Sequence, residues 1–354
     1  MDVRKFDFTI KKILFIILII FIFFIILELV TKIFYLKAGN TIIYHKYFGW
    51  INKPDSIGAK FTGSKINFYS YDNLGFRITK EQVKNKQQKI FIVGDSIIDA
   101  REVNDNSHLQ NILRKLFINY NYDIFTFGVS GWGTDQEYLF INSLLNKEKE
   151  IKLIGLTFYT GNDFHNNIKN EYKTFFKTYY KPYFKIQNDT FILLNNPVPQ
   201  EKLFFGFEFF KKYSSFYKFS NEIIFPLLLK IINKNNNYND FYLSSDFEKS
   251  SKITEFLLKD LNNKLNNNKK FFVIIIPSMS EVRKKNESEY IKKIRTICEE
   301  NKILYINCYL EFNKNSKKPE RDYYLQFDGH LNENGHLVLA KIIFNFLTQN
   351  NLLN

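Results

Sequence analysis

A serine follows an apolar run of strand length in the segment KIFIVGDSIIDA, residues 89–100. The run ends at Gly94, and an apolar-periodic stretch follows, which is typical of a strand, a turn and a helix. Ser96 would then lie at the carboxyl end of a buried strand and the amino end of a helix, where backbone N–H groups are free and the helix dipole is positive. A hydroxyl there can act as a nucleophile, although Gly-Asp-Ser by itself more often forms a turn with a helix cap.

Two residues near the carboxyl terminus could activate such a serine. Asp328 and His330 stand in the segment FDGHLNENGH, in a loop before the last predicted helix. A carboxylate can orient an imidazole, which in turn accepts the serine proton. His336 lies inside the predicted helix, and we expect it to be structural.

Two further segments end at the same predicted sheet edge. The second predicted strand runs into FGVSGWGTDQ, whose glycines (Gly128, Gly131, Gly133) are usually structural but can also present an unhindered backbone N–H. The third predicted strand runs into YTGNDFHNN, which brings Asn162 and Asp163 to that edge. A side-chain amide donor at a strand end is what an oxyanion hole needs, whereas the alternative for Asn162-Asp163 is a turn or helix cap.

Alternating strands and helices must position these residues. The predicted strands are 89–93, 123–128, 152–159, 271–277 and 303–308, and the predicted helices are 106–119, 134–146, 249–265, 281–300 and 333–348. Nearly continuous apolar strands separated by helices predict a parallel sheet that is covered on both faces. The predicted fold class is therefore α/β.

In these four blocks and in their order, the chain resembles the SGNH (GDSL-type) hydrolases. The resemblance covers residues 89–348 apart from an insertion at about 164–248. It implies a three-layer α/β/α sandwich with a five-stranded parallel sheet of the flavodoxin-like kind. It also implies an enzyme that acts on ester bonds and needs neither a metal nor an organic cofactor.

The same resemblance implies a role for each site residue. Ser96 would be the nucleophile and, through its backbone N–H, the first oxyanion donor. Gly131 would donate its N–H, and Asn162 its side-chain amide. His330 would be the general base, oriented by Asp328, whereas we expect Asp163 only to hold its turn.

Two blocks depart from the usual pattern of the family. A single residue, Gly329, separates Asp328 from His330, a spacing similar to that of membrane-associated alginate O-acetylation proteins, which makes acyl transfer an alternative to hydrolysis. Thr160 stands where the third block usually begins with glycine. The lead-in, with FGWINKP and NLGFR, resembles membrane-anchored bacterial members of the family, so we expect a bacterial envelope protein.

A membrane segment is predicted near the amino terminus. Residues 13–27 are apolar without interruption, and a span over 13–31 is just long enough to cross a bilayer. Its basic flank (Arg4, Lys5, Lys11, Lys12) predicts a cytoplasmic tail over 1–12 and everything after the span across the membrane. The alternative is a cleaved signal peptide, but no small-x-small pattern follows, so we expect an uncleaved single-pass anchor.

The rest of the chain divides into three parts. We expect residues 38–88 to be a lead-in of short strands that packs on the main domain, and residues 89–354 to form that domain. Within the insertion, YYKPYFKIQND and TFILLNNPVP predict a hairpin, and 204–219 and 221–232 predict one or two helices. Such an insertion usually shapes a substrate cleft or lid, and the alternative is padding without a function.

Charge and cysteine content exclude some functions. The net charge is +14, but most of the 50 basic residues are lysines scattered among Asn, Ile, Phe and Tyr, so we expect no nucleic-acid partner. Cys298 and Cys308 fit no metal motif, and we expect two buried free thiols in a helix and a strand, respectively.

Three functions remain open from the sequence. The first is an extracytoplasmic esterase that removes acyl groups, such as acetyl, from a surface glycan or a related ester, a lipid included. The second is an O-acyltransferase for such a glycan, which would need a membrane partner to deliver acyl groups. The third is a non-catalytic glycan-binding protein with the same fold.

Overall fold

The computed structural model describes residues 3–35, 41–62, 65–78, 86–173, 178–188, 190–200, 213–220, 224, 244–265, 270–284, 286–326 and 328–353. Their contacts divide the chain into two units. One unit, the helix unit, comprises residues 1–39 and 202–235; the other, the sheet unit, comprises residues 40–201 and 236–354. The candidate catalytic residues all belong to the sheet unit.

Five parallel strands form the centre of the sheet unit, as predicted. They are β5 (Gln88–Gly94), β6 (Tyr122–Gly128), β7 (Ile151–Tyr159), β12 (Lys270–Ile276) and β13 (Leu304–Asn307), in the order β13-β12-β7-β5-β6. Numbered along the chain, this is the 2-1-3-4-5 order of flavodoxin-like sheets, which reverses direction between β5 and β7. Ligands of such sheets bind at the carboxyl ends of the strands beside that reversal, and Ser96 stands two residues after the end of β5.

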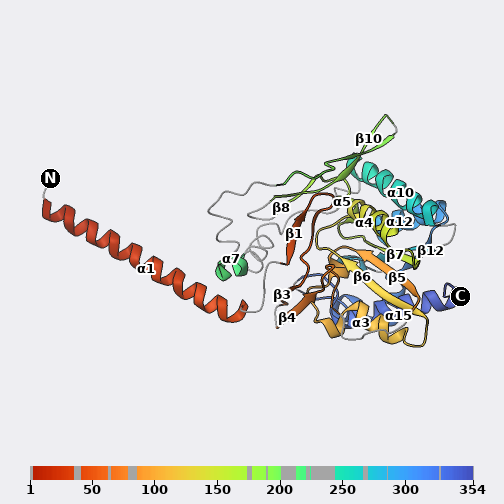
Figure 1. Ribbon diagram of the computed structural model, residues 1–354, viewed down its shortest axis with the longest axis horizontal. Helices are drawn as coiled ribbons and strands as arrows, with labels where there is room; N and C mark the ends of the chain where they lie inside the picture. The colour runs from red at the N-terminus through yellow and green to blue at the C-terminus, as the bar shows by residue number, and fades with distance from the viewer. Residues whose placement is uncertain are drawn as a thin grey trace. The chain divides into compact units, whose positions relative to one another are not determined.

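Helices cover both faces of this sheet (Figure 1). On one side lie α3 (Leu109–Leu116) and α15 (Glu333–Gln349); on the other lie α4 (Thr134–Lys147), α10 (Ser245–Leu265) and α12 (Glu289–Glu300). Because both faces are covered, the strand residues are buried along almost their whole length, as in Ile90–Val93 and Phe271–Ile276. This explains why the strands read as continuous apolar runs and confirms the predicted three-layer class.

Two predicted elements differ from the structure. The helix predicted over 281–300 is two helices, α11 (Met279–Val282) and α12, because the Ser288 side chain caps a new helix by accepting from Ile291 N. The strand predicted over 303–308 ends at Asn307, whose side chain accepts from Tyr309 N and starts α13 (Cys308–Asn315). Cys308 is therefore helical, not in a strand; both cysteines are buried and free, as predicted.

The lead-in consists of two antiparallel hairpins of the sheet unit. β1 (Ile42–His45) pairs with β2 (Gly49–Asn52), and β3 (Ser56–Phe61) pairs with β4 (Ile66–Tyr71). Trp50, Tyr69 and Tyr71 are buried, so aromatic side chains anchor these short strands against the rest of the sheet unit.

Parts of the insertion are also hairpins of the sheet unit. After α5 (Asp163–Asn166), β8 (Glu171–Lys173) pairs with β9 (Thr178–Tyr180), and β10 (Tyr183–Gln187) pairs with β11 (Thr190–Leu194), where a hairpin was predicted. Of the helices predicted over 204–219 and 221–232, α7 (Ser215–Phe219) belongs to the helix unit. The remainder of those two predictions lies almost entirely outside the described residues.

In the described part of the chain, one helix is long and apolar enough to cross a membrane. It is α1 (Val3–Tyr35), in which residues 12–33 have a mean hydropathy of 3.5. Glu28 stands within this stretch, and its carboxylate accepts hydrogen bonds from Ser214 Oγ and from the backbone N–H groups of Ser215 and Phe216. These contacts satisfy the one acidic group of the stretch and tie α7 to α1 within the helix unit.

Candidate functional site

Ser96 is placed by a tight strand-to-helix turn. It is the first residue of α2 (Ser96–Asp99), and Asp95 caps that helix by accepting from Ile97 N at 2.9 Å. At Gly94 a Cβ would collide with the Thr157 hydroxyl on β7, so a glycine lets the chain turn close to the neighbouring strand. The Ser96 side chain is only partly buried, as a nucleophile must be.

The structure brings His330 and Asp328 to this serine. The Nε2 atom of His330 lies 2.9 Å from Ser96 Oγ, and its Nδ1 contacts Asp328 Oδ1. The connecting loop is shaped by Gly329, which has φ +84°, and by the hydrogen bond from Leu325 N to His330 O at 2.8 Å. With Nδ1 protonated and bound to Asp328, Nε2 is the acceptor for the Ser96 proton.

His336 lies elsewhere, on α15. It is 1% exposed and stacks on His108, with ring centroids 6.0 Å apart. Burial, together with the charges of Arg77 and His330, lowers the pKa of His336 to about 3. The imidazole is therefore neutral over the whole physiological range, as befits a packed core residue.

The two further predicted oxyanion donors follow the two neighbours of β5 in the sheet, β7 and β6. Asn162 donates its side-chain amide to Asp95 Oδ2 at 2.9 Å. An amide nitrogen carries two hydrogens, so one can bind Asp95 while the other remains for a substrate oxygen. Gly131 has φ +82°, which favours glycine, and a Cβ there would come within 3.3 Å of the Tyr172 ring from the insertion.

Asp163 holds the turn after β7. Its Oδ2 accepts from Tyr159 N at 2.7 Å, and it is fully buried. Burial and the charges of neighbouring carboxylates raise the pKa of Asp163 well above its usual range. The same causes raise the pKa of Glu137, whose carboxyl oxygens have no hydrogen-bond partner among the described residues.

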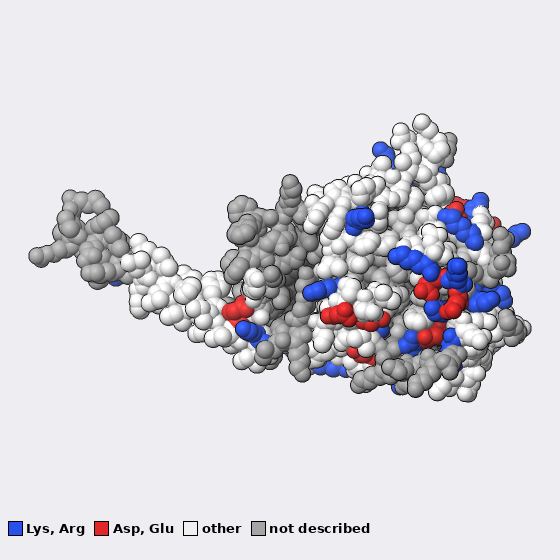
Figure 2. All heavy atoms as spheres, in the orientation of Figure 1, with Lys and Arg blue, Asp and Glu red and all other residues white. Residues whose placement is uncertain are grey.

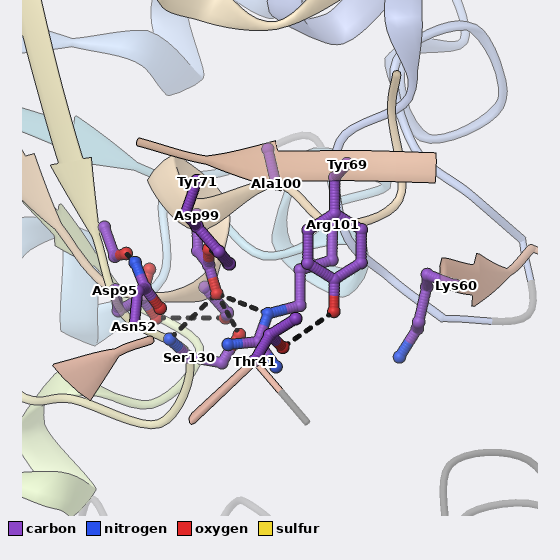
Figure 3. A network of polar contacts seen from close by, with 12 residues as sticks. Thr41, Asn52, Lys60, Tyr69, Tyr71, Asp95, Asp99, Ala100, Arg101 and Ser130 are labelled. Carbon is purple, nitrogen blue, oxygen red and sulfur yellow. Dashed lines mark hydrogen bonds and ion pairs between the residues drawn. The ribbon is translucent and has the colours of Figure 1, made fainter. Parts of the chain in front are cut away.

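A buried polar network joins the serine turn to the Gly131 turn (Figure 3). Asp99, in the last position of α2, accepts from Ser130 N at 3.2 Å and from Ser130 Oγ at 2.8 Å. It also accepts from the Tyr71 hydroxyl and pairs with Arg101 Nε at 2.7 Å. Asp99 therefore fixes Ser130, and with it the adjacent Gly131 N–H, relative to the helix that begins at Ser96.

The lead-in holds the same two turns from the other side. Trp50 Nε1 donates to Ser130 O at 3.0 Å, and Asn52 Nδ2 donates to Gly128 O at 2.8 Å. Arg77 donates through Nη1 to Asp99 O at 2.7 Å and to the neighbouring carbonyl of Ala100. The aromatic residues of this region predicted packing on the main domain, but no local pattern in the sequence indicated these contacts.

Two charged residues beside His330 were missed by sequence analysis. Glu102 Oε1 lies 3.8 Å from His330 Nδ1, and Lys60 Nζ lies 3.6 Å from both Glu102 Oε1 and Asp328 Oδ2. Glu102 is six positions after Ser96, but no motif or periodicity in the sequence links the two residues. Lys60 is on β3, far away in the sequence, and no local signal marks it.

These charges control the protonation of His330. Burial by itself would lower the pKa of the imidazole, but the carboxylates of Glu102 and Asp328 outweigh it and raise the pKa to about 9. Burial also raises the pKa of Asp95, against hydrogen bonds from Ile97 N and Asn162 and the charge of His330. The imidazole of His330 therefore binds a proton tightly, and this stabilises the imidazolium that forms when His330 takes the proton of Ser96.

Comparison with known proteins adds a likeness of fold. No family model and no curated protein matches the sequence. Among solved structures, a lipolytic G-D-S-L family protein from Veillonella parvula is 10% identical, with a TM-score of 0.41 over 74% of this chain and 99% of that one. A lipase/acylhydrolase from Enterococcus faecalis is 11% identical, with a TM-score of 0.40 over 74% and 96% of the two chains. An acetylxylan esterase from Geobacillus stearothermophilus is 12% identical, with a TM-score of 0.39 over 74% and 95%.

The protein from Veillonella parvula is named as a member of the G-D-S-L family, which is the family that the sequence motifs resemble. At such identity and TM-score these matches carry no argument about the reaction. The chemistry of the site follows from the arrangement of Ser96, His330 and Asp328 and of the donors around them.

Proposed function

We propose that this protein is a serine esterase of the SGNH (GDSL) type that works through an acyl-serine intermediate. The observation that carries the proposal is the 2.9 Å contact between Ser96 Oγ and His330 Nε2, with Asp328 on the other ring nitrogen. Nucleophile, base and orienting acid in this order are what serine acyl transfer needs.

In the first half of the reaction Ser96 Oγ attacks the carbonyl carbon of an ester while His330 Nε2 takes the hydroxyl proton. The negative oxygen of the tetrahedral intermediate is held by the N–H groups of Ser96 and Gly131 and by the Asn162 amide. His330 then gives its proton to the leaving alcohol as the ester bond breaks. This leaves an acyl-serine and a neutral imidazole.

In the second half a hydroxyl compound attacks the acyl-serine and gives its proton to His330. With water as the acceptor, the acid is released and Ser96 regains its proton, which is hydrolysis. With a sugar hydroxyl as the acceptor, the same steps transfer the acyl group to a glycan. The short Asp328-Gly329-His330 spacing, which resembles that of O-acetylation proteins, is the reason to keep transfer as the second candidate.

We place the reaction outside the cytoplasm and on an acylated surface glycan. The apolar stretch 12–33 of α1 and its basic flank support a single-pass anchor with a cytoplasmic amino terminus. Basic and acidic side chains are interspersed on the face of the sheet unit in Figure 2, a distribution that favours a weakly charged substrate over nucleic acid. The acetylated sugar is supported by the sequence resemblance alone.

The test uses the full chain in detergent micelles, with p-nitrophenyl acetate and an acetylated polysaccharide as substrates. We expect acetate release from both, loss of release in Ser96→Ala, and a covalent adduct of a fluorophosphonate on Ser96 in mass spectra. Acetyl transfer to an added acceptor glycan, in place of acetate release, would favour the transferase. No adduct on Ser96 and no turnover of any ester would leave a binding protein and overturn the proposal.

A further inference from the structure

Two carboxylates, not one, face the Nδ1 side of His330. Asp328 contacts Nδ1 directly, and Glu102 Oε1 lies 3.8 Å from the same nitrogen. Glu102 is the more buried of the two, with 6% of its side chain exposed against 23% for Asp328. It comes from the loop after α2, so the segment that supplies the nucleophile also supplies an acid for the base.

Lys60 joins the two acids from a third segment. Its Nζ lies 3.6 Å from Glu102 Oε1 and 3.6 Å from Asp328 Oδ2, and 28% of its side chain is exposed. Burial by itself would lower the pKa of Lys60, but the charges of Glu102 and Asp328 raise it, so the ammonium form is kept. Imidazole, two carboxylates and one ammonium thus form a single cluster, the His330 cluster (Lys60, Glu102, Asp328, His330).

We propose that Glu102 is a second acid for His330, and that Lys60 holds Glu102 and Asp328 beside the ring so that the cluster sets the charge of the imidazole during catalysis. This inference rests on the proposed role of His330 as the base. Both Glu102 and Lys60 are positioning residues in this assignment, because they act through His330 and contact neither Ser96 nor the reacting ester.

The other charged groups around His330 do not replace this pair. Asp95, the cap of α2, is next to Ser96 in the chain and so belongs to the Nε2 side of the ring. Burial raises the pKa of Asp95. His336 on α15 is neutral, and Arg77 pairs with Asp105 at 2.8 Å. Glu333, at the start of α15, pairs with Lys65 at 2.7 Å. Glu102 and Asp328 are therefore the carboxylates assigned to Nδ1.

The cluster also resembles a metal site, and that alternative needs a separate argument. In the described residues, Glu102, Asp328 and His330 are one group of donors close enough together, within 4.8 Å, to hold a cation. However, Lys60 already places a positive charge 3.6 Å from each acid, and Nδ1 is engaged by Asp328. Charge balance therefore favours an arrangement in which the two acids interact with the imidazole and the ammonium, and not with a metal ion.

The experiment measures the titration of His330 itself in the full chain in detergent micelles. The imidazole is followed by NMR of ¹³C-labelled histidine and assigned with His330→Gln. Glu102→Gln should lower the pKa of His330 by about one unit or more, because an opposite charge at this range shifts a pKa by roughly 1–3 units. Lys60→Met should raise it, because the positive charge of Lys60 lowers the pKa of His330 more directly than its hold on the two acids raises that pKa. Glu333→Gln, which removes a carboxylate that is paired elsewhere, is the matched control and should leave it unchanged.

Reaction of Ser96 with a fluorophosphonate, followed against pH, provides the second measurement. The pH midpoint of this reaction should move down in Glu102→Gln and up in Lys60→Met. Thermal unfolding of each variant shows whether it is folded. If one variant is misfolded, the result from the other variant is used. An unchanged His330 midpoint in a folded Glu102→Gln or Lys60→Met variant would overturn the inference, as would activity that EDTA abolishes and Zn²⁺ restores. Failure of the proposed function would look different: wild-type Ser96 would not be labelled, although the His330 titration would still report on the cluster.

Discussion

At the scale of single residues, two histidines six positions apart have opposite environments. His330 contacts Ser96 and Asp328, whereas His336 is buried on α15 with no contact to either. We predict that His330→Ala abolishes turnover, whereas His336→Ala lowers mainly the free energy of unfolding. Ser96→Ala and the Ser96/His330 double variant should be about equally inactive, each down by roughly 10⁴ or more, because the members of a triad act as a unit.

The measurement is kcat on p-nitrophenyl acetate together with the thermal unfolding midpoint of each variant. Losses that add up in the double variant would show that the two residues act independently. A His336→Ala variant with normal stability but no turnover would indicate that His336, and not His330, is the base.

The charge of His330 leads to a prediction about pH. Its pKa is raised to about 9 by Glu102 and Asp328 against the effect of burial, so at pH 7 only roughly one molecule in a hundred has a neutral imidazole. We expect kcat/KM to rise with pH from neutrality and to level off near pH 9. A profile that is already flat below pH 7 would contradict this.

The same shift affects stability with a defined sign. The pKa of His330 is higher in the folded protein than the ordinary value of about 6.5, so the folded state binds the proton more tightly. This contribution to stability is fully present below about pH 6.5 and is lost as the pH rises through about 9. Activity and stability therefore change in opposite directions over that interval.

Asn162 allows a sharp test of the oxyanion hole. If its free amide hydrogen binds charge that develops only in the transition state, Asn162→Ala should lower kcat by roughly 10² to 10³ with little change in KM. Asp163→Asn should disturb folding more than chemistry, because Asp163 binds Tyr159 N and not the substrate. Steady-state kinetics on several esters, with mass spectrometry of the acyl-serine, measures both. An Asn162→Ala variant with near-normal kcat on every ester would make Asn162 a turn residue.

At the scale of elements, the lead-in hairpins take part in positioning the active site. The Tyr71 hydroxyl donates to buried Asp99, which in turn binds Ser130 beside Gly131. We predict that Tyr71→Phe costs about 1.5–3 kcal/mol of unfolding free energy, the usual value of a hydrogen bond to a charged group. Because Gly131 is then held less firmly, kcat should also fall several-fold.

Tyr69→Phe is the matched control. The Tyr69 hydroxyl lies 3.1 Å from Thr41 Oγ1, a neutral partner, so its loss should cost about 1 kcal/mol and leave kcat nearly unchanged. Urea unfolding and kcat of the full chain in detergent measure both variants. Equal effects on kcat would show that the hydroxyl of Tyr71 has no special connection to the Gly131 turn.

Local patterns in the sequence predicted the sheet and the segments that carry the proposed triad well. A parallel sheet covered on both faces must have apolar strands, and its strand ends bring Gly94, Gly131 and Asn162 to one edge whatever the details of packing. In contrast, the end of β13 depends on one side chain, Asn307, which caps α13 and could equally have continued the strand. Glu102 and Lys60 belong to the site only through tertiary packing, which no spacing in the chain records.

At the scale of the whole molecule, the helix unit, which contains α1, and the sheet unit are separate compact units, so topology has to be tested in the intact chain. The helix α1 offers 22 residues, 12–33, that can cross a bilayer, preceded by basic residues on the amino-terminal side. For a helix that spans the membrane, the positive-inside rule predicts a cytoplasmic amino terminus and export of everything after the span. Glu28 is tolerated in that stretch because hydrogen bonds from residues 214–216 satisfy its carboxylate.

We predict that alkaline phosphatase fused after Asn354, which is active only outside the cytoplasm, is active in cells, whereas a cytoplasm-dependent reporter at the same position is not. A chain that starts after Ile33 should reverse both results, because it lacks the span. Replacing Arg4, Lys5, Lys11 and Lys12 together with Gln should reduce export, since these charges orient the helix. A cytoplasmic reporter that is active in the unaltered chain would place His330 and Ser96 inside the cell, and a surface glycan could then no longer be their substrate.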